Sequence, residues 1–153
     1  MTYIESLLKK AVTNNQIREY LIGGLGYEEI PERNAEIVET DYYSRLTCLC
    51  SNGLPEKETI ANVATEEIVN LLKGDAHLLR IGIIYLRSYC NAKQFGYNLP
   101  INEKEFFSKA RDILLARKQE LQKIQHGSQN GTMWNFVERV DRKVQEQTGN
   151  RIL

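Results

Sequence analysis

The stretch AHLLRIGIIYLRSYCN, residues 76–91, decides the fold. Apolar side chains cover most of its circumference, and its only charged side chains are Arg80 and Arg87, seven positions apart. A helix that is apolar on nearly every side is usually buried among other elements. We therefore expect residues 76–91 to form the central helix of a bundle, with the two arginines reaching water or a carboxylate.

Amphipathic segments on both sides of this stretch supply the helices that would surround it. Apolar residues recur at helical spacing over residues 60–72, 106–124 and 134–144. Asn102, with Glu105 three positions later, has the form of a helix start. From that start we predict one long helix that continues without a break to about Gln125.

Short polar breaks separate the predicted helices. Gly74 and Asp75 leave almost no room between two helical segments, so those helices must be antiparallel neighbours. Longer breaks, with glycine, proline or asparagine, fall near 23–35, 51–54, 95–101 and 127–131. The sequence therefore predicts an all-α fold, with one domain over residues 1–153 and five to seven helices.

Residues 36–50 carry two competing signals. Val38, Tyr42, Leu46 and Leu49 form a stripe at helical spacing, which favours a helix from about 34 to 50. Aromatic and β-rich content in the same segment keeps a strand possible. We favour the helix and leave the strand as the alternative.

Charge and cysteine content limit the classes of function. The 20 basic and 20 acidic side chains balance, so net charge gives no reason to expect a nucleic acid or a membrane surface as partner. Three cysteines, two of them only two positions apart, make a poor disulfide framework and an incomplete zinc site. The first residues lack a basic segment followed by an apolar run. We expect a cytoplasmic protein with no membrane span, no metal and no cofactor.

Acidic side chains crowd positions 28–41, opposed only by Arg33. Magnesium prefers carboxylate oxygens, and Glu36 and Glu39 could share one helical face. Pro31 interrupts the run where a metal-presenting helix should continue. A magnesium-dependent helical nucleotide hydrolase is therefore the second alternative only.

Tyrosines next to the acidic run suggest a surface for a protein partner. Tyrosine is enriched in protein interfaces, because its ring is apolar and its tip is polar. The candidate partner-binding residues are Glu36, Glu39, Tyr42 and Tyr43.

Basic residues accumulate toward the end of the chain, where residues 101–153 hold 10 basic and 7 acidic side chains. The ring of Trp134, which lies among these cationic residues, could stack on a nucleic-acid base. The candidate nucleic-acid-binding residues are Arg117, Lys118, Lys123, Trp134, Arg139, Arg142 and Lys143. Acidic residues alternate with them in the last helix, a pattern typical of an ordinary exposed helix.

The sequence contains no convincing catalytic constellation, so we expect a non-enzymatic protein. The favoured function is protein–protein interaction in a regulatory or adaptor role, with another protein or a second copy of the chain as partner. Nucleic-acid binding through the basic C-terminal helices is the first alternative, since the charge pattern there permits it without favouring it.

Overall fold

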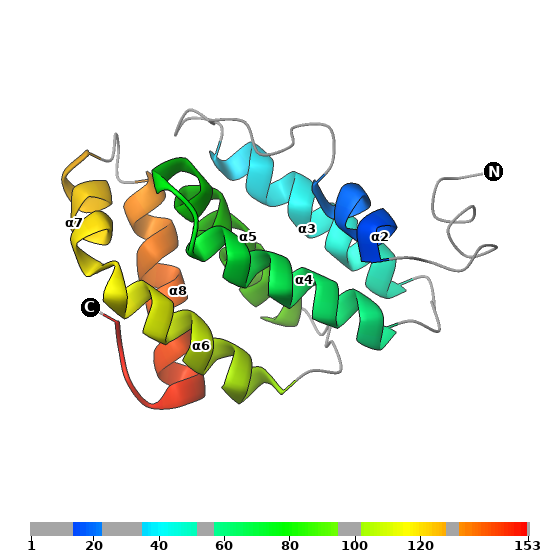
Figure 1. Ribbon diagram of the computed structural model, residues 1–153. Coiled ribbons are helices and arrows are strands. Elements are labelled where there is room, and N and C mark those ends of the chain that lie inside the picture. The colour runs from blue at the N-terminus through cyan, green and yellow to red at the C-terminus, as the bar shows by residue number, and fades with distance from the viewer. Residues whose placement is uncertain (1–13, 23–34, 52–56, 95–101, 128–131, 153) are drawn as a thin grey trace.

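A computed structural model describes residues 14–22, 35–51, 57–94, 102–127 and 132–152. These residues form seven helices (Figure 1). The helices are α2 (Asn14–Ile22), α3 (Ala35–Ser51), α4 (Lys57–Leu72), α5 (Ala76–Gln94), α6 (Glu103–Ala116), α7 (Lys118–Gly127) and α8 (Thr132–Thr148). The all-α prediction is therefore confirmed.

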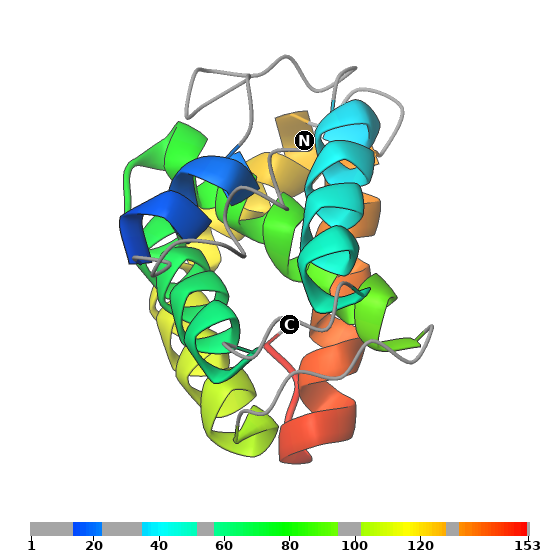
Figure 2. The same ribbon diagram turned by 90° about the vertical axis from the view of Figure 1, so that its right-hand side faces the viewer.

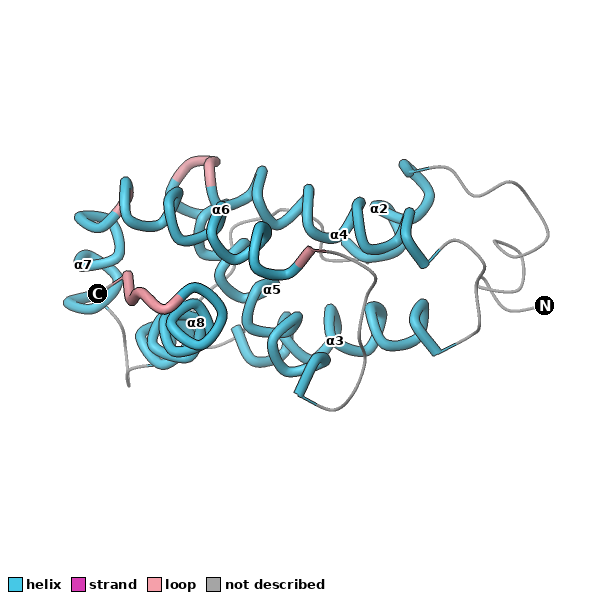
Figure 3. Tube along the Cα trace, turned by 90° about the horizontal axis from the view of Figure 1, so that it is seen from below, coloured by secondary structure: helices cyan, strands magenta, loops and turns pink. Residues whose placement is uncertain are grey.

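Helix α5 lies between two layers of helices, as the sequence predicts for residues 76–91. Helices α2, α4 and α6 form one layer, while α3 and α8 form the other (Figures 2 and 3). Helix α5 packs extensively against α3, α4 and α8, and α6 also packs against α8. All apolar positions from Ile81 to Leu86 are buried. Full burial of one such side chain stabilises a fold by roughly 1.5–3 kcal/mol, so this helix contributes strongly to the stability of the bundle.

Close approach of α4 and α5 depends on one glycine. A Cβ atom added at Gly82 would lie 3.1 Å from the Cβ of Leu71 and 3.1 Å from the backbone nitrogen of Leu72. The missing side chain therefore lets the two antiparallel helices pack with little space between their backbones.

Residues 36–50 belong to helix α3, so the predicted helix is confirmed and the alternative strand is wrong. The stripe of Val38, Tyr42, Leu46 and Leu49 is buried throughout. The ring of Tyr42 stacks on that of Tyr85 in α5, with centroids 3.9 Å apart and an interplanar angle of 9°. This ring pair fixes α3 on the central helix.

The predicted uninterrupted helix from Asn102 to about Gln125 is wrong, because the chain breaks at Arg117 into α6 and α7. The start is as expected, since the side chain of Asn102 accepts a hydrogen bond from the backbone N–H of Glu105. At the break, Arg117 has φ −114° and ψ 27°, and its N–H donates to the carbonyl oxygens of Leu114 and Leu115. The residues there are all good helix formers, so local propensity gives no sign of the break.

Most residues in the predicted loops near 23–35, 51–54, 95–101 and 127–131 lie outside the described part of the chain. Within the described part, no helix combines the length and apolar character needed to cross a membrane.

Candidate functional site

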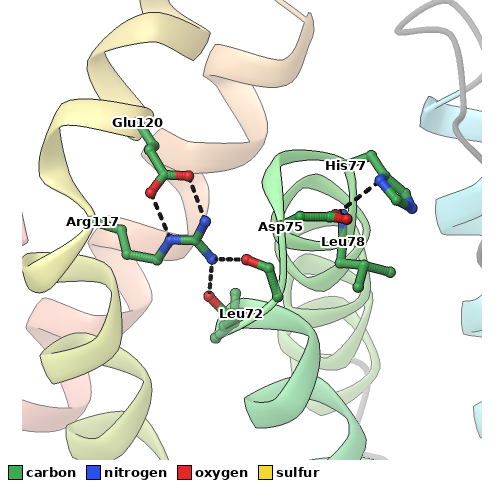
Figure 4. Close-up of polar contacts among 7 residues, drawn as sticks. Leu72, Asp75, His77, Leu78, Arg117 and Glu120 are labelled. Atoms are coloured by element: carbon green, nitrogen blue, oxygen red, sulfur yellow. Dashed lines mark hydrogen bonds and ion pairs between the residues drawn. The ribbon is translucent and has the colours of Figure 1, made fainter.

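The turn between α4 and α5 is built from backbone and side-chain hydrogen bonds. The N–H of Gly74 donates to the carbonyl oxygen of Leu71, which ends α4. The carboxylate of Asp75 accepts from the N–H of Leu78 at 3.2 Å, which starts α5. His77 Nδ1 lies 2.8 Å from the same carboxylate (Figure 4). The predicted tight connection is confirmed, and Asp75 is the residue that makes it possible.

Arg117 joins this turn to the break between α6 and α7. Its Nη1 donates to the carbonyl oxygen of Leu72 at 2.7 Å and to that of Gly74 (Figure 4). Its Nε and Nη2 donate to the two carboxylate oxygens of Glu120. We call these four residues the Arg117 cluster. Helix C-termini leave carbonyl oxygens without a helical partner, and a guanidinium group satisfies them here.

Glu120 is held in its charged form by this arrangement. The hydrogen bonds from Arg117 lower the pKa of the Glu120 carboxyl group below its ordinary value, and the charges of Arg117 and Lys123 act in the same direction. A two-pronged guanidinium–carboxylate contact is stronger and more directional than a single ion pair. Glu120 therefore orients the guanidinium group of Arg117, which in turn joins the α6–α7 break to the α4–α5 turn.

A cleft of about 530 Å³ opens beside the Arg117 cluster, between the start of α5 and the α6–α7 break. Its walls combine apolar and cationic side chains with one carboxylate. We call it the cationic cleft, and its lining residues are Ala76, Leu79, Arg80, Ala116, Arg117, Gln119, Glu120, Lys123 and Ile124. This volume falls within the usual range for small-ligand sites, roughly 300–1,000 Å³.

A second polar cluster joins α3 to α5. One carboxylate oxygen of Glu39 lies 3.2 Å from Arg87 Nη1, and the other accepts from Asn91 Nδ2 at 3.2 Å. The hydroxyl of Ser88 donates to the backbone carbonyl oxygen of Glu39 at 3.0 Å. We call these four residues the Glu39 cluster. The guanidinium of Arg87 also lies over the ring of Phe136 in α8, 4.1 Å from its centroid.

The pKa of Glu39 is shifted in the opposite direction to that of Glu120. Burial removes water from its carboxyl group and raises its pKa above the ordinary value, although Arg87 and Asn91 oppose the shift. Arg87 thus reaches a carboxylate, as the sequence predicts. The cluster stabilises the contact of α3 with α5, which is a structural role.

The four predicted partner-binding residues do not form one exposed surface, because some are buried and others are exposed. Tyr42 is only 1% exposed, so it belongs to the core and is not available to a partner in this structure. Its place in the buried stripe was already visible in the sequence. Glu39 is engaged in the Glu39 cluster, Glu36 is exposed, and Tyr43 is half-buried against the core. The sequence did not single out Ile37, which is 62% exposed on the same helix.

The predicted nucleic-acid residues are not equally available. Arg117 is engaged in its cluster, Trp134 packs partly buried against the core, and Lys143 lies 3.1 Å from the carboxylate of Glu146. The remaining side chains are half-buried at Arg139 and exposed at Lys118, Lys123 and Arg142. Of the whole set, only Arg117 and Lys123 meet in the cationic cleft.

The last helix, α8, is not an ordinary exposed helix as its charge pattern predicts, because one of its acidic residues, Asp141, lies in the interior. This residue is completely buried. Its carboxylate accepts from the N–H of Ile152 and from Arg151 Nε at 2.8 Å. The contact fixes the segment after α8 against the helix, and no sequence spacing signals it.

The described residues contain no group of three or more His, Cys, Asp or Glu side chains that could hold a metal ion. Glu138 and Asp141 have the Glu-x-x-Asp spacing of a metal-binding pair, but Asp141 is occupied by Arg151. Glu28, Glu29 and Glu32 lie outside the described part of the chain.

Comparison of the chain with models of protein families, with characterised proteins and with solved structures gave no significant match.

Proposed function

We propose that this protein acts without catalysis, by binding another protein through the outer face of α3. The observation that carries the proposal is the exposure of Ile37, a large apolar residue that is 62% exposed to solvent. A single exposed apolar residue is common on protein surfaces. What distinguishes Ile37 is its place on the helix where the acidic and tyrosine-rich segment is also found.

The neighbours of Ile37 define the chemistry of the partner. Glu36 precedes it and is exposed, and Thr40 is exposed one turn later. Tyr43 lies seven residues after Glu36 and therefore on a similar side of the helix, and it is half-buried. Such a surface fits a partner that offers an apolar side chain next to a lysine or arginine.

The proposed partner is another protein or a second copy of the chain, and the proposed role is regulatory or that of an adaptor. We propose a cytoplasmic location for this activity. Within the described part of the chain, Cys48 and Cys90 form no disulfide bond, which agrees with a reducing compartment.

The test compares Ile37→Glu with a matched variant, Leu115→Glu. Leu115 is the other large exposed apolar residue among the described positions, at 42%, and it lies on α6. Cross-linked partners would be quantified in the native cell, and light scattering would measure self-association of the purified chain. We expect Ile37→Glu to reduce the captured partner or dimer by about tenfold or more, which corresponds to about 1.4 kcal/mol. Equal effects of the two variants would contradict the proposal.

Nucleic-acid binding is the weaker proposal, supported by the exposure of Lys118, Lys123 and Arg142. Contacts with phosphates release counterions, so binding must weaken steeply as salt is added. Fluorescence anisotropy with single- and double-stranded oligonucleotides at increasing salt tests it, and salt-independent binding would argue against it. Magnesium-dependent hydrolysis gains no support from the described carboxylates.

A further inference from the structure

A groove runs between α4 and α6, two neighbouring helices in the same layer of the fold (Figure 3). We call it the α4–α6 groove, and its volume is about 830 Å³. Two of its lining residues, Val69 and Phe106, are apolar and buried. The others are polar or charged, so a partner in this groove must offer polar and charged groups. These residues are Glu58, Asn62, Thr65, Glu66, Asn70, Lys73, Asn102, Glu105 and Lys109.

The two helices run in the same direction, so the groove has two different ends (Figure 1). Arg117, which directly follows α6, donates to the carbonyl oxygen of Leu72, the last residue of α4, and thereby brings the two C-terminal ends together. The other end of the groove lies at the N-terminal turns of the two helices. At a rise of 1.5 Å per residue, Glu58 and Lys73 are roughly 22 Å apart along α4.

The charge of the lining changes sign from one end of the groove to the other. Glu58 lies in the first turn of α4 and Glu105 in the first turn of α6, so this end is acidic. Lys73 directly follows α4 and makes the opposite end basic. Glu66 and Lys109, which are opposite in sign, lie between the two ends.

These five charged side chains have no partner of opposite charge in the part of the chain that the structure describes. All five residues are exposed. Single unpaired charges are ordinary on a protein surface. What distinguishes this set is its order along a groove, because the order makes the charges complementary to those of a second, identical groove turned end to end.

We propose that two copies of the chain associate through their α4–α6 grooves. A two-fold axis perpendicular to the groove places α4 of each copy antiparallel to α4 of the other, in the other copy's groove. Glu58 of each copy then lies near Lys73 of its partner, and the same pair forms twice. Complementary charges of this kind fix the orientation of a complex more than its strength.

The polar lining limits the strength of the association. Exposed ion pairs contribute little each, and only Val69 and Phe106 add apolar contact. We expect a dissociation constant on the order of 100 μM at low salt, and weaker association as salt screens the charges. The groove is separate from α3, so the dimer does not rest on the proposed binding through Ile37 and leaves that helix available to another protein.

Charge reversal at the two ends of the groove tests the proposal. Sedimentation and light scattering would follow the full chain from about 10 μM to 1 mM. Glu58→Lys and Lys73→Glu each place like charges opposite one another at two points of the interface. We therefore expect each single variant to weaken the dimer roughly five- to tenfold.

Restoration by two combinations provides the sharper test. The double variant Glu58→Lys/Lys73→Glu reverses the order of charge in both copies, so its dimer should return to within about threefold of wild type. An equimolar mixture of the two single variants should associate equally well, because one carries only positive charge at these positions and the other only negative. The double variant also opposes the dipole of α4 at both ends, so its thermal stability should fall while its association recovers.

Arg142→Glu is the matched control for net charge, since Arg142 is exposed on α8 in the opposite layer. We expect it to leave the dissociation constant within about twofold, and circular dichroism establishes that every variant folds. Ile37→Glu should also leave the dimer intact. The proposal is overturned if the wild-type chain remains monomeric at about 1 mM, if neither combination restores association, or if Arg142→Glu or Ile37→Glu weakens the dimer as much as the single groove variants.

Discussion

Two arginine–glutamate pairs lie where elements of this fold meet, and the pKa values of their carboxyl groups shift in opposite directions. Glu120 is 38% exposed and receives two hydrogen bonds from Arg117, which lower its pKa. Glu39 is 16% exposed and lies 3.2 Å from a single nitrogen of Arg87, and the loss of water raises its pKa. The pair nearer to water is the one in which the carboxylate charge is favoured.

The difference between the two pKa shifts indicates what each arginine contributes to the fold. In the Glu39 cluster, attraction by Arg87 does not fully offset the desolvation of the carboxylate, as is common for buried ion pairs. In the Arg117 cluster, the Glu120 side chain is 38% exposed, and the same guanidinium group also donates to the carbonyl oxygens of Leu72 and Gly74. Arg117 therefore binds backbone groups of the α4–α5 turn as well as a carboxylate, whereas Arg87 contacts a carboxylate and the ring of Phe136.

The largest effect should come from Arg117→Met. This change leaves the carbonyl oxygens of Leu72 and Gly74 without their charged donor, and each such hydrogen bond contributes about 1.5–3 kcal/mol. Because water can reach part of the site, we expect the free energy of unfolding to fall by about 2–3 kcal/mol. Urea denaturation at neutral pH measures it.

Arg87→Met is the matched comparison for Arg117→Met. Methionine retains much of the apolar contact with Phe136, and Glu39 can take up a proton when its partner is lost. Because Arg87 is 27% exposed and Glu39 16%, we expect a loss of about 1–2 kcal/mol, less than the roughly 3–5 kcal/mol for a fully buried pair. A larger loss for Arg87→Met than for Arg117→Met would reverse the roles that the geometry assigns to the two arginines.

The fold was largely predictable because it follows from local patterns. The apolar circumference of residues 76–91 identified the central helix, and the stripe from Val38 to Leu49 identified α3. Both patterns repeat over several turns, so no single residue decides them. The Gly74–Asp75 turn was equally visible, since its side-chain cap lies within three residues of the N–H that it binds.

The candidate site was not predictable, because it depends on contacts between residues far apart in the sequence. Arg117 lies 45 positions from Leu72 and 43 from Gly74, and nothing in its own neighbourhood indicates that it would satisfy their carbonyl oxygens. The same holds for Glu39, whose partners lie on α5. Charge counting identified Arg117 as a surface cation and missed that the fold uses it internally.

Glu39→Gln isolates the effect of the desolvated charge. A carboxyl group whose pKa is raised on folding destabilises the folded state as pH rises from below its unfolded pKa through its folded pKa. Glutamine resembles the protonated acid and cannot ionise. We therefore expect the stability of the variant relative to wild type to improve from about pH 4 to pH 7, by about 1 kcal/mol or less. Denaturation curves at both pH values measure it, and an opposite trend would show that Arg87 outweighs desolvation.

Glu120→Gln should give the smallest effect, with the opposite dependence on pH. A lowered folded pKa stabilises the folded state above the unfolded value of about 4.5, and this stabilisation is lost as pH falls through the folded pKa. Because Glu120 is more than one-third exposed, solvent screens the pair, and we expect the variant to lose only about 0.5 kcal/mol at pH 7.

The dependence on pH and salt separates this small effect from a loss of packing. The gap between Glu120→Gln and wild type should close at about pH 3, and at pH 7 it should shrink in about 1 M salt, where charges are screened within about 3 Å. Glu39→Gln should change less with salt, because its carboxylate is more buried. If the gap for Glu120→Gln persisted at low pH, the carboxylate charge would not be its cause, and the contrast between the two pairs would reduce to burial alone.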